Sequence, residues 1–178
     1  MQAKIKRQEF NSITDADLST KCFEPLIKHY KKRMAEQTDS TQMKEQFYEE
    51  LTEGQRALFM FYAYYIHVSK SSIEFFWWSA YFIAQPKSWS AIKAALKFFE
   101  DTNMLILLEK IELILKQHQY PETLESFTIT REDLANNKEL YTTIQSLYSV
   151  FEDTSPLTIK NINNIIEKNL KDFVEIED

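Results

Sequence analysis

Glycine is nearly absent from this sequence. Gly54 is the single glycine among 178 residues, whereas glycine makes up roughly 7% of ordinary chains. The tight turns with positive φ that join strands in all-β folds rely on glycine. The phosphate-binding loops of P-loop and dinucleotide-binding proteins need several glycines within one motif. The sequence therefore predicts an all-α fold and excludes both kinds of phosphate-binding loop.

Cysteine and histidine are also scarce. Cys22 is the single cysteine, so an internal disulfide is impossible and a reducing compartment is expected. His29, His67 and His118 lie in different segments, and the chain contains neither Glu-x-x-His nor His-Glu-x-x-His, the motifs of di-iron bundles and zinc proteases. Cys22 and His29 would lie about 10 Å apart along a helix, too far for a thiolate–imidazole pair. We predict no catalytic residue, metal site or cofactor, and this favours a non-enzymatic function.

Signals for export or membrane insertion are missing as well. The first 18 residues are polar and lack the apolar segment of a secretory signal. The longest apolar stretch runs from Ala57 to Val68, the length of a buried core helix, and Lys70 and Glu74 interrupt its continuation. We therefore expect a cytoplasmic protein without a membrane partner.

Apolar spacing, capping residues and proline predict about seven helices in a single domain over residues 1–178. The polar segment 1–14 and the acidic end 175–178 are candidates for flexibility. Thr52 and Gln55 form a capping box, the clearest helix start in the chain. The predicted helical segments are 15–36, 42–51, 53–68, 72–84, a helix capped by Ser88 and carrying Trp89 to Phe99, one carrying Met104 to Leu115, one capped by Thr130 and carrying Leu134 to Phe151, and a last one carrying Ile159 to Phe173.

Aromatic residues, in contrast, are concentrated in residues 72–86, which read SIEFFWWSAYFIAQP. At 100° per residue, one side of this helix would carry Ile73, Phe76, Trp77, Ala80 and Ala84, and nearly the opposite side Phe75, Trp78 and Phe82. A helix that is apolar on both sides is typically buried between neighbours. We therefore expect this helix and the one over 53–68 to form a central aromatic-rich antiparallel pair.

A second interpretation of the same segment is an aromatic-lined pocket. Indole N–H and tyrosine hydroxyl groups need polar partners when they are buried, and ligand pockets combine aromatic walls with a few polar groups. His67, Lys70 and Glu74 would lie near the break between the two helices, and Tyr81 would share one edge of the second helix with Glu74. The candidate pocket residues are His67, Lys70, Glu74, Trp77, Trp78 and Tyr81.

Residues 51–86 also carry a family resemblance. They read LTEGQRALFMFYAYYIHVSKSSIEFFWWSAYFIAQP, a capped Gln-Arg start, a long apolar helix, a short break, and an acidic residue followed by paired aromatics. This segment resembles the central part of a bacterial family of uncharacterised helical domains that includes a DNA-mimic protein. The matching positions are Gln55, Arg56, Val68, Ile73, Glu74, Phe76 and Trp77. The resemblance implies an all-α fold and a macromolecular partner.

Charge is unevenly distributed along the chain. Residues 121–178 carry five basic and twelve acidic side chains, a balance of −7. Mixed charge of this kind is typical of a solvated face, but spaced carboxylates are also what a mimic of the DNA phosphates requires. The candidate partner-binding residues are Glu132, Asp133, Glu139, Glu152, Asp153, Glu167 and Asp172.

Two other charged groups have ordinary explanations. The basic residues of KHYKKR, residues 28–33, lie late in a predicted helix, where the helix dipole favours cations. We therefore expect no direct binding of nucleic acid. Glu109 and Glu112 lie one turn apart on a predicted helix and are interpreted as surface residues.

Two function classes follow from these patterns. The first is a non-enzymatic interaction protein that presents a partly acidic helical surface to a macromolecular partner such as a nucleic-acid-binding protein. The second is a small-molecule binder or an enzyme that uses the aromatic-lined pocket around residues 67–81. The lack of catalytic spacings favours the first class, whereas exposure of Trp77 or Trp78 beside a cavity would favour the second.

Overall fold

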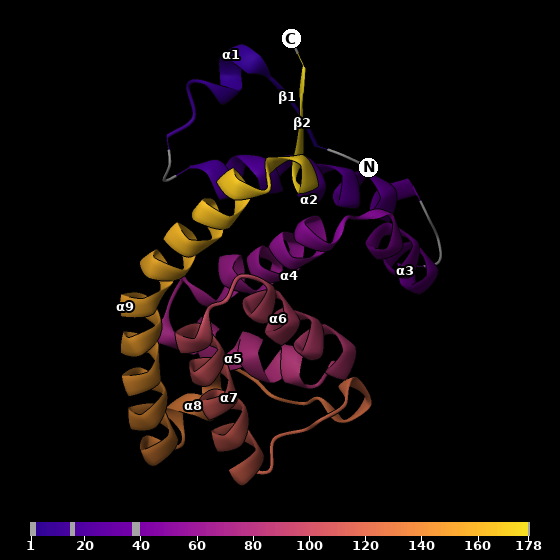
Figure 1. The fold of residues 1–178 in the computed structure, drawn as a ribbon. Helices are drawn as coiled ribbons and strands as arrows, with labels where there is room; N and C mark the ends of the chain where they lie inside the picture. The colour runs from indigo at the N-terminus through magenta and orange to yellow at the C-terminus, as the bar shows by residue number, and fades with distance from the viewer. Residues whose placement is uncertain (1–2, 15–16, 37–39, 178) are drawn as a thin grey trace. The chain divides into compact units, whose positions relative to one another are not determined.

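The computed structural model describes residues 3–14, 17–36 and 40–177. These residues are predominantly helical, which confirms the all-α class (Figure 1). Two four-residue strands, β1 (Ala3–Lys6) and β2 (Val174–Glu177), accompany two short 3₁₀ helices, η1 (Leu124–Ser126) and η2 (Leu170–Asp172). The α-helices are α1 (Arg7–Phe10), α2 (Leu18–Glu36), α3 (Ser40–Glu50), α4 (Glu53–Val68), α5 (Ser72–Ile83), α6 (Pro86–Phe98), α7 (Thr102–Gln117), α8 (Glu132–Ala135) and α9 (Lys138–Lys168).

Contacts between residues divide the chain into two compact units. Unit 1 comprises Met1–Phe59 and Ile159–Asp178, and unit 2 comprises Met60–Thr158, so both boundaries fall inside helices, α4 and α9. The single domain over 1–178 stays a prediction. Residues 15 and 16, where the first predicted helix begins, lie outside the described residues, as do residues 1, 2 and 178 at the ends of the predicted flexible segments.

The start of α4 is the most accurate of the predictions. Gln55 donates its backbone N–H to Thr52 Oγ1 over 3.1 Å, and Thr52 donates its backbone N–H to Gln55 Oε1 over 3.2 Å, which confirms the capping box. The helix ends at Val68 as predicted. The cap also holds the last part of unit 1, because Gln55 Nε2 donates to the carbonyl of Phe173 over 3.1 Å.

The start of α6 corrects the predicted Ser88 cap. The helix begins at Pro86, with Gln85 as the residue before it. Proline suits the first turn of a helix because the N–H group that it lacks has no partner there. Pro86 therefore begins the next helix and does not merely end the preceding one.

The division of the last two predicted helices is also wrong. The chain breaks after α8, where the Asn137 side chain accepts a hydrogen bond from the backbone N–H of Leu140 and caps α9. From there α9 continues through Pro156 to Lys168. Buried residues recur along one face of this helix at helical spacing, from Leu140 and Ile144 to Ile162 and Ile166. The continuous buried face outweighs the loss of one backbone hydrogen bond at Pro156.

The two strands were not predicted. In unit 1, β1 pairs with β2 in parallel, with Ala3 opposite Val174 and Ile5 opposite Ile176. Ile5 and Val174 are buried. A four-residue strand shows too little alternation for its periodicity to be recognised, and its partner here comes from the other end of the sequence.

In unit 2, α5 packs against α6 and α7 and buries one face. The buried residues of α5 follow helical spacing and are Ser72, Phe75, Phe76, Ser79, Ala80 and Ile83. Ile73 is 38% exposed, and Trp77, Trp78, Tyr81 and Phe82 are half-buried. Each of the two predicted apolar sides thus contains fully buried as well as half-buried residues, and the expected burial holds only in part. Ile73, Trp77, Trp78, Tyr81 and Phe82 form the outer side of α5.

Candidate functional site

Five of the six candidate pocket residues come together on the outer side of α5. The His67 and Trp78 rings stack with centroids 3.7 Å apart, and Trp78 Nε1 donates to Glu74 Oε2 over 2.9 Å. The rings of Trp77 and Tyr81 stack at 5.3 Å, and Trp77 Nε1 donates to the carbonyl of Ile129 over 2.9 Å. Both indole N–H groups thus find partners within unit 2.

Lys70 differs from the other five because its side chain is exposed at the turn between α4 and α5. It acts on the cluster through its charge. Burial and the Lys70 charge lower the pKa of His67, while Glu74 opposes them. His67 Nδ1 is buried without a hydrogen-bond partner. A neutral imidazole fits this environment, because a charged ring would stack against Trp78 with one N–H unsatisfied.

Arg131 completes the cluster and was not among the predicted residues. Its Nε lies 2.6 Å from Glu74 Oε1 and its Nη2 lies 2.8 Å from Glu74 Oε2. Its guanidinium lies over the Trp77 ring, 4.5 Å from the centroid. The hydrogen bonds from Arg131 hold the pKa of Glu74 below its ordinary value, against the opposing effect of burial.

These contacts give the cluster a structural role that the sequence did not indicate, namely to hold residues 127–131 against α5. Phe127 lies against both Trp77 and Tyr81, with centroids 5.7 and 5.6 Å away, so residues 127–131 cover the outer side of α5. Glu74 accepts from Arg131 and Trp78 at once. A general-base role for Glu74 would therefore require the Arg131 pair to open.

The seven candidate acidic residues are all exposed. Within the part of the chain that the structure describes, none of them lies within ion-pair distance of a cationic side chain. Asp133 accepts the backbone N–H of Thr130 over 2.7 Å at the start of α8. Unit 2 carries Glu132, Asp133, Glu139, Glu152 and Asp153, and unit 1 carries Glu167 and Asp172.

Glu112 behaves differently and corrects its interpretation as a surface residue. Its carboxylate accepts hydrogen bonds from Trp89 Nε1 at 2.8 Å and Lys93 Nζ at 2.7 Å, and Lys116 Nζ lies 3.0 Å away. Burial would raise the pKa of Glu112, but the hydrogen bonds from Lys93, Trp89 and Lys116 outweigh it and lower the pKa from 4.5 to about 2. Glu112 therefore links α6 to α7 inside unit 2.

Replacement of Glu112 by glutamine should destabilise unit 2 in a pH-dependent manner. Because the pKa is lower in the folded chain than in the unfolded chain, the ionised carboxylate stabilises the fold above pH 4.5, and this contribution disappears as the pH falls towards 2. After allowance for solvent screening, we expect Glu112→Gln to cost about 1 kcal/mol near neutral pH. Urea unfolding of both proteins at several pH values measures this difference, which should narrow below pH 4.5. A difference that stays constant down to pH 3 would contradict the assignment.

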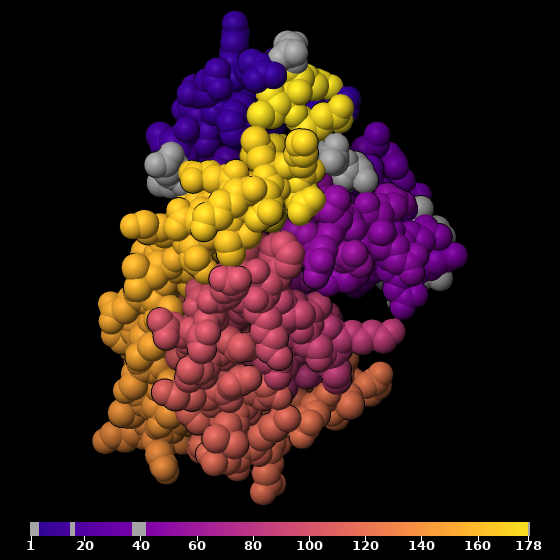
Figure 2. All heavy atoms as spheres, viewed as in Figure 1, coloured from indigo at the N-terminus to yellow at the C-terminus, as the bar shows by residue number. Residues whose placement is uncertain are grey.

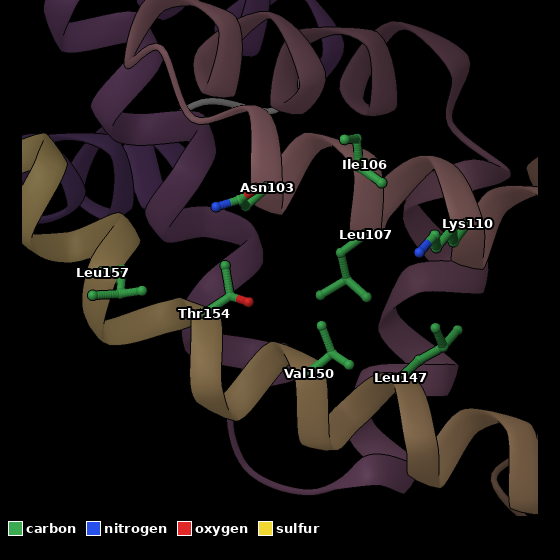
Figure 3. A pocket seen from close by; sticks show the side chains of 8 residues that line it. All are labelled: Asn103, Ile106, Leu107, Lys110, Leu147, Val150, Thr154 and Leu157. Atoms are coloured by element: carbon green, nitrogen blue, oxygen red, sulfur yellow. The ribbon is translucent and has the colours of Figure 1, made fainter.

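A groove between α7 and α9 is a second candidate site, and no prediction anticipated it. Its volume is about 260 Å³, and α7 contributes Asn103, Ile106, Leu107 and Lys110 while α9 contributes Leu147, Val150, Thr154 and Leu157 (Figure 3). Ile106, Val150 and Leu157 are 44%, 48% and 63% exposed. The sequence does signal this surface, because these three residues lie off the core faces of their helices.

Comparison with known proteins gives no match: no protein-family model, curated protein or solved structure is similar to the chain. The resemblance over residues 51–86 therefore stays a prediction. None of the described helices is both long and apolar enough to cross a membrane. In the described ranges, no three His, Cys, Asp or Glu side chains cluster closely enough to hold a metal ion.

Proposed function

We propose that this chain is a non-enzymatic interaction protein of the bacterial cytoplasm, which presents a partly acidic helical surface to a basic macromolecular partner such as a nucleic-acid-binding protein. The observation that carries the proposal is that the acidic candidates are exposed and that none of them lies within ion-pair distance of a cationic side chain among the described residues. Unpaired surface carboxylates leave their field available to a partner, whereas the ion-paired Glu74 and Glu112 do not.

Unit 2 is the better supported location for this surface. Its residues 60–158 include eight Lys or Arg and twelve Asp or Glu, a balance of −4. Five of the seven acidic candidates belong to it, on α8 and α9. The resemblance of residues 51–86 to a family with a DNA-mimic member supports the same class of partner.

The proposal includes the predicted antiparallel pair of α4 and α5 as the support of this surface. Within unit 2, Tyr64 Oη and Ser79 Oγ lie 2.8 Å apart, and the Tyr64 ring lies 5.7 Å from that of Phe82. One turn further along α4, His67 meets Trp78. The residue number rises along α4 as it falls along α5, and this order of contacts supports an antiparallel pair.

Charge reversal tests the acidic surface. Partners would be captured from a lysate of the native host with the full chain, identified by mass spectrometry and purified. Because exposed charges steer encounter, the combined change Glu132→Lys, Asp133→Lys and Glu139→Lys should slow association by about tenfold and affect dissociation less. Biolayer interferometry measures both rates. The matched control is Glu49→Lys on α3 in unit 1, which should leave both rates unchanged.

Salt provides the second arm of this experiment. The Debye length falls from about 10 Å at 0.1 M to about 3 Å at 1 M salt, so an encounter governed by exposed carboxylates should weaken steeply with salt. Binding that responds neither to salt nor to the charge reversals would refute the acidic surface.

The second candidate function is the binding of a small molecule beside α5. The observation in its favour is the buried Nδ1 of His67, which has no partner in the described structure. Native mass spectrometry of the protein purified from its host should then detect an adduct that Trp78→Ala does not retain. A wild-type protein without any adduct would count against this candidate.

A further inference from the structure

The α7 and α9 helices repeat one surface pattern on the two sides of their groove. On α7, Glu109 lies three residues after Ile106 and four before Leu113. On α9, Asp153 lies three residues after Val150 and four before Leu157. Residues three and four apart share a helix face, so each helix presents an aliphatic, an acidic and a second aliphatic side chain in a row.

Both rows are available to a partner. Ile106, Leu113, Val150 and Leu157 are 44%, 57%, 48% and 63% exposed, and they make up half of the large apolar residues that the described structure exposes. Glu109 and Asp153 are exposed and lie beyond ion-pair distance of every cationic side chain described. Single exposed apolar residues are common on proteins, but a cluster around a groove marks an interaction site.

The size of the surface fits one helix. The row on α7 spans residues 106–113 and the row on α9 spans residues 150–157, so each extends about 10 Å along its helix axis. In Figure 2 the side chains of α9, in orange, border those of α7, in salmon, on one face of unit 2. An amphipathic helix of about three turns would place its i, i+3, i+4 and i+7 side chains over the groove.

We propose that the groove between α7 and α9 binds an amphipathic helix whose apolar face covers Ile106, Val150 and Leu157 and whose flanks carry Lys or Arg opposite Glu109 and Asp153. The proposal rests on the proposed function and names the form of the basic partner. The charge of the two rows selects this occupant, because each row carries one exposed carboxylate between its two aliphatic side chains. In a pairing of two copies through this face, Glu109 and Asp153 of one copy would approach those of the other and repel them.

Lys110 gives the bound helix a direction. It is the only charged residue among those lining the groove, and its side chain lies on the α7 wall at the end near Leu147 (Figure 3). A cation is stabilised by the C-terminus of a helix and destabilised by the N-terminus. The bound helix should therefore end, not begin, beside Lys110.

The experiment uses the full chain and a fluorescent synthetic helical peptide of about 18 residues, with leucine on one face and lysine on both flanks. Two matched peptides serve as controls, one with glutamate in place of lysine and one with the same residues in shuffled order. Fluorescence anisotropy measures the dissociation constant. We expect the lysine peptide to bind at least about tenfold more tightly than either control peptide.

Protein variants then locate the binding site. Leu157→Asn and Asp153→Lys should each raise the dissociation constant of the lysine peptide by about tenfold, because one removes an apolar contact and the other reverses a flanking charge. Ile73→Asn on α5 and Glu125→Lys on η1, both exposed and outside the proposed binding surfaces, are the matched controls in the same unit and should change it by less than about twofold. Circular dichroism confirms that each variant is folded.

Three outcomes would overturn the proposal. Failure of the lysine peptide to bind would exclude a basic amphipathic helix as the occupant of the groove. The proposed function would still be tested separately with the partner captured from the lysate. Binding that Glu132→Lys weakens and Leu157→Asn does not would keep the acidic surface and exclude the groove. Self-association in analytical ultracentrifugation that Leu157→Asn abolishes would identify a second copy as the occupant.

Discussion

Phe76→Ala should lower the free energy of unfolding by about 3–5 kcal/mol. Phe76 is completely buried on the inner face of α5, and its ring lies 5.4 Å from that of Tyr120. Truncation removes the transfer free energy of the ring and leaves a cavity that the neighbouring helices can fill only in part. Denaturant unfolding followed by circular dichroism measures the change.

Trp77→Ala is the matched control on the adjacent position of the same helix. Trp77 is half-buried, so less apolar surface is lost with its side chain, although the hydrogen bond to Ile129 and the contact with Arg131 are lost as well. We expect a cost of about 2 kcal/mol, clearly smaller than that of Phe76→Ala. Equal costs for the two substitutions would contradict a one-sided core for α5.

The contrast between these two residues shows that helical periodicity alone does not predict which residues of α5 are buried. Phe76 and Trp77 are adjacent and both apolar, and a helical wheel places them on the same side of α5. Their burial differs because the face with Phe75, Phe76, Ser79 and Ala80 is fully buried, whereas residues 127–131 cover Trp77 only in part. The sequence predicted the helix and its limits, whereas the position of its neighbours depends on tertiary packing that no local pattern encodes.

The candidate site illustrates the same limit. Glu74, Trp77 and Trp78 share one helix and were grouped correctly by spacing. Arg131 follows Glu74 by 57 residues, and nothing local in the sequence links the two. The capping box at Thr52 was predictable because both partners lie within four residues. Hydrogen bonds within one helical turn can be predicted from the sequence, and those between elements require the fold.

Gly54→Ala should also destabilise the protein, although alanine favours helices over glycine by about 1 kcal/mol. Gly54 is the second residue of α4 and does not have a positive φ, so its backbone conformation does not require glycine. Its neighbour does. A Cβ atom at this position would lie 2.7 Å from Phe173 Cζ and 3.0 Å from Cε1.

Phe173 has little freedom to withdraw from this added atom. Its ring is completely buried in unit 1, its carbonyl accepts from Gln55 Nε2, and the preceding carbonyl, of Asp172, accepts from Thr52 Oγ1 over 2.5 Å. Overpacking of a fixed core site costs up to about 3 kcal/mol, which exceeds the gain in helix propensity and leaves a net loss of about 2 kcal/mol.

A double-mutant cycle with Phe173→Leu distinguishes this collision from a general effect of alanine on α4. Leucine leaves room beside residue 54, so Gly54→Ala should cost much less in the Phe173→Leu background than in the wild type. The expected coupling between the two substitutions is about 1–2 kcal/mol in favour of the double variant, obtained from the unfolding free energies of the four proteins. Additive costs would mean that the alanine methyl group does not meet the Phe173 ring. The single glycine of the chain would then reflect composition and not the close approach of α4 to the segment that leads into β2.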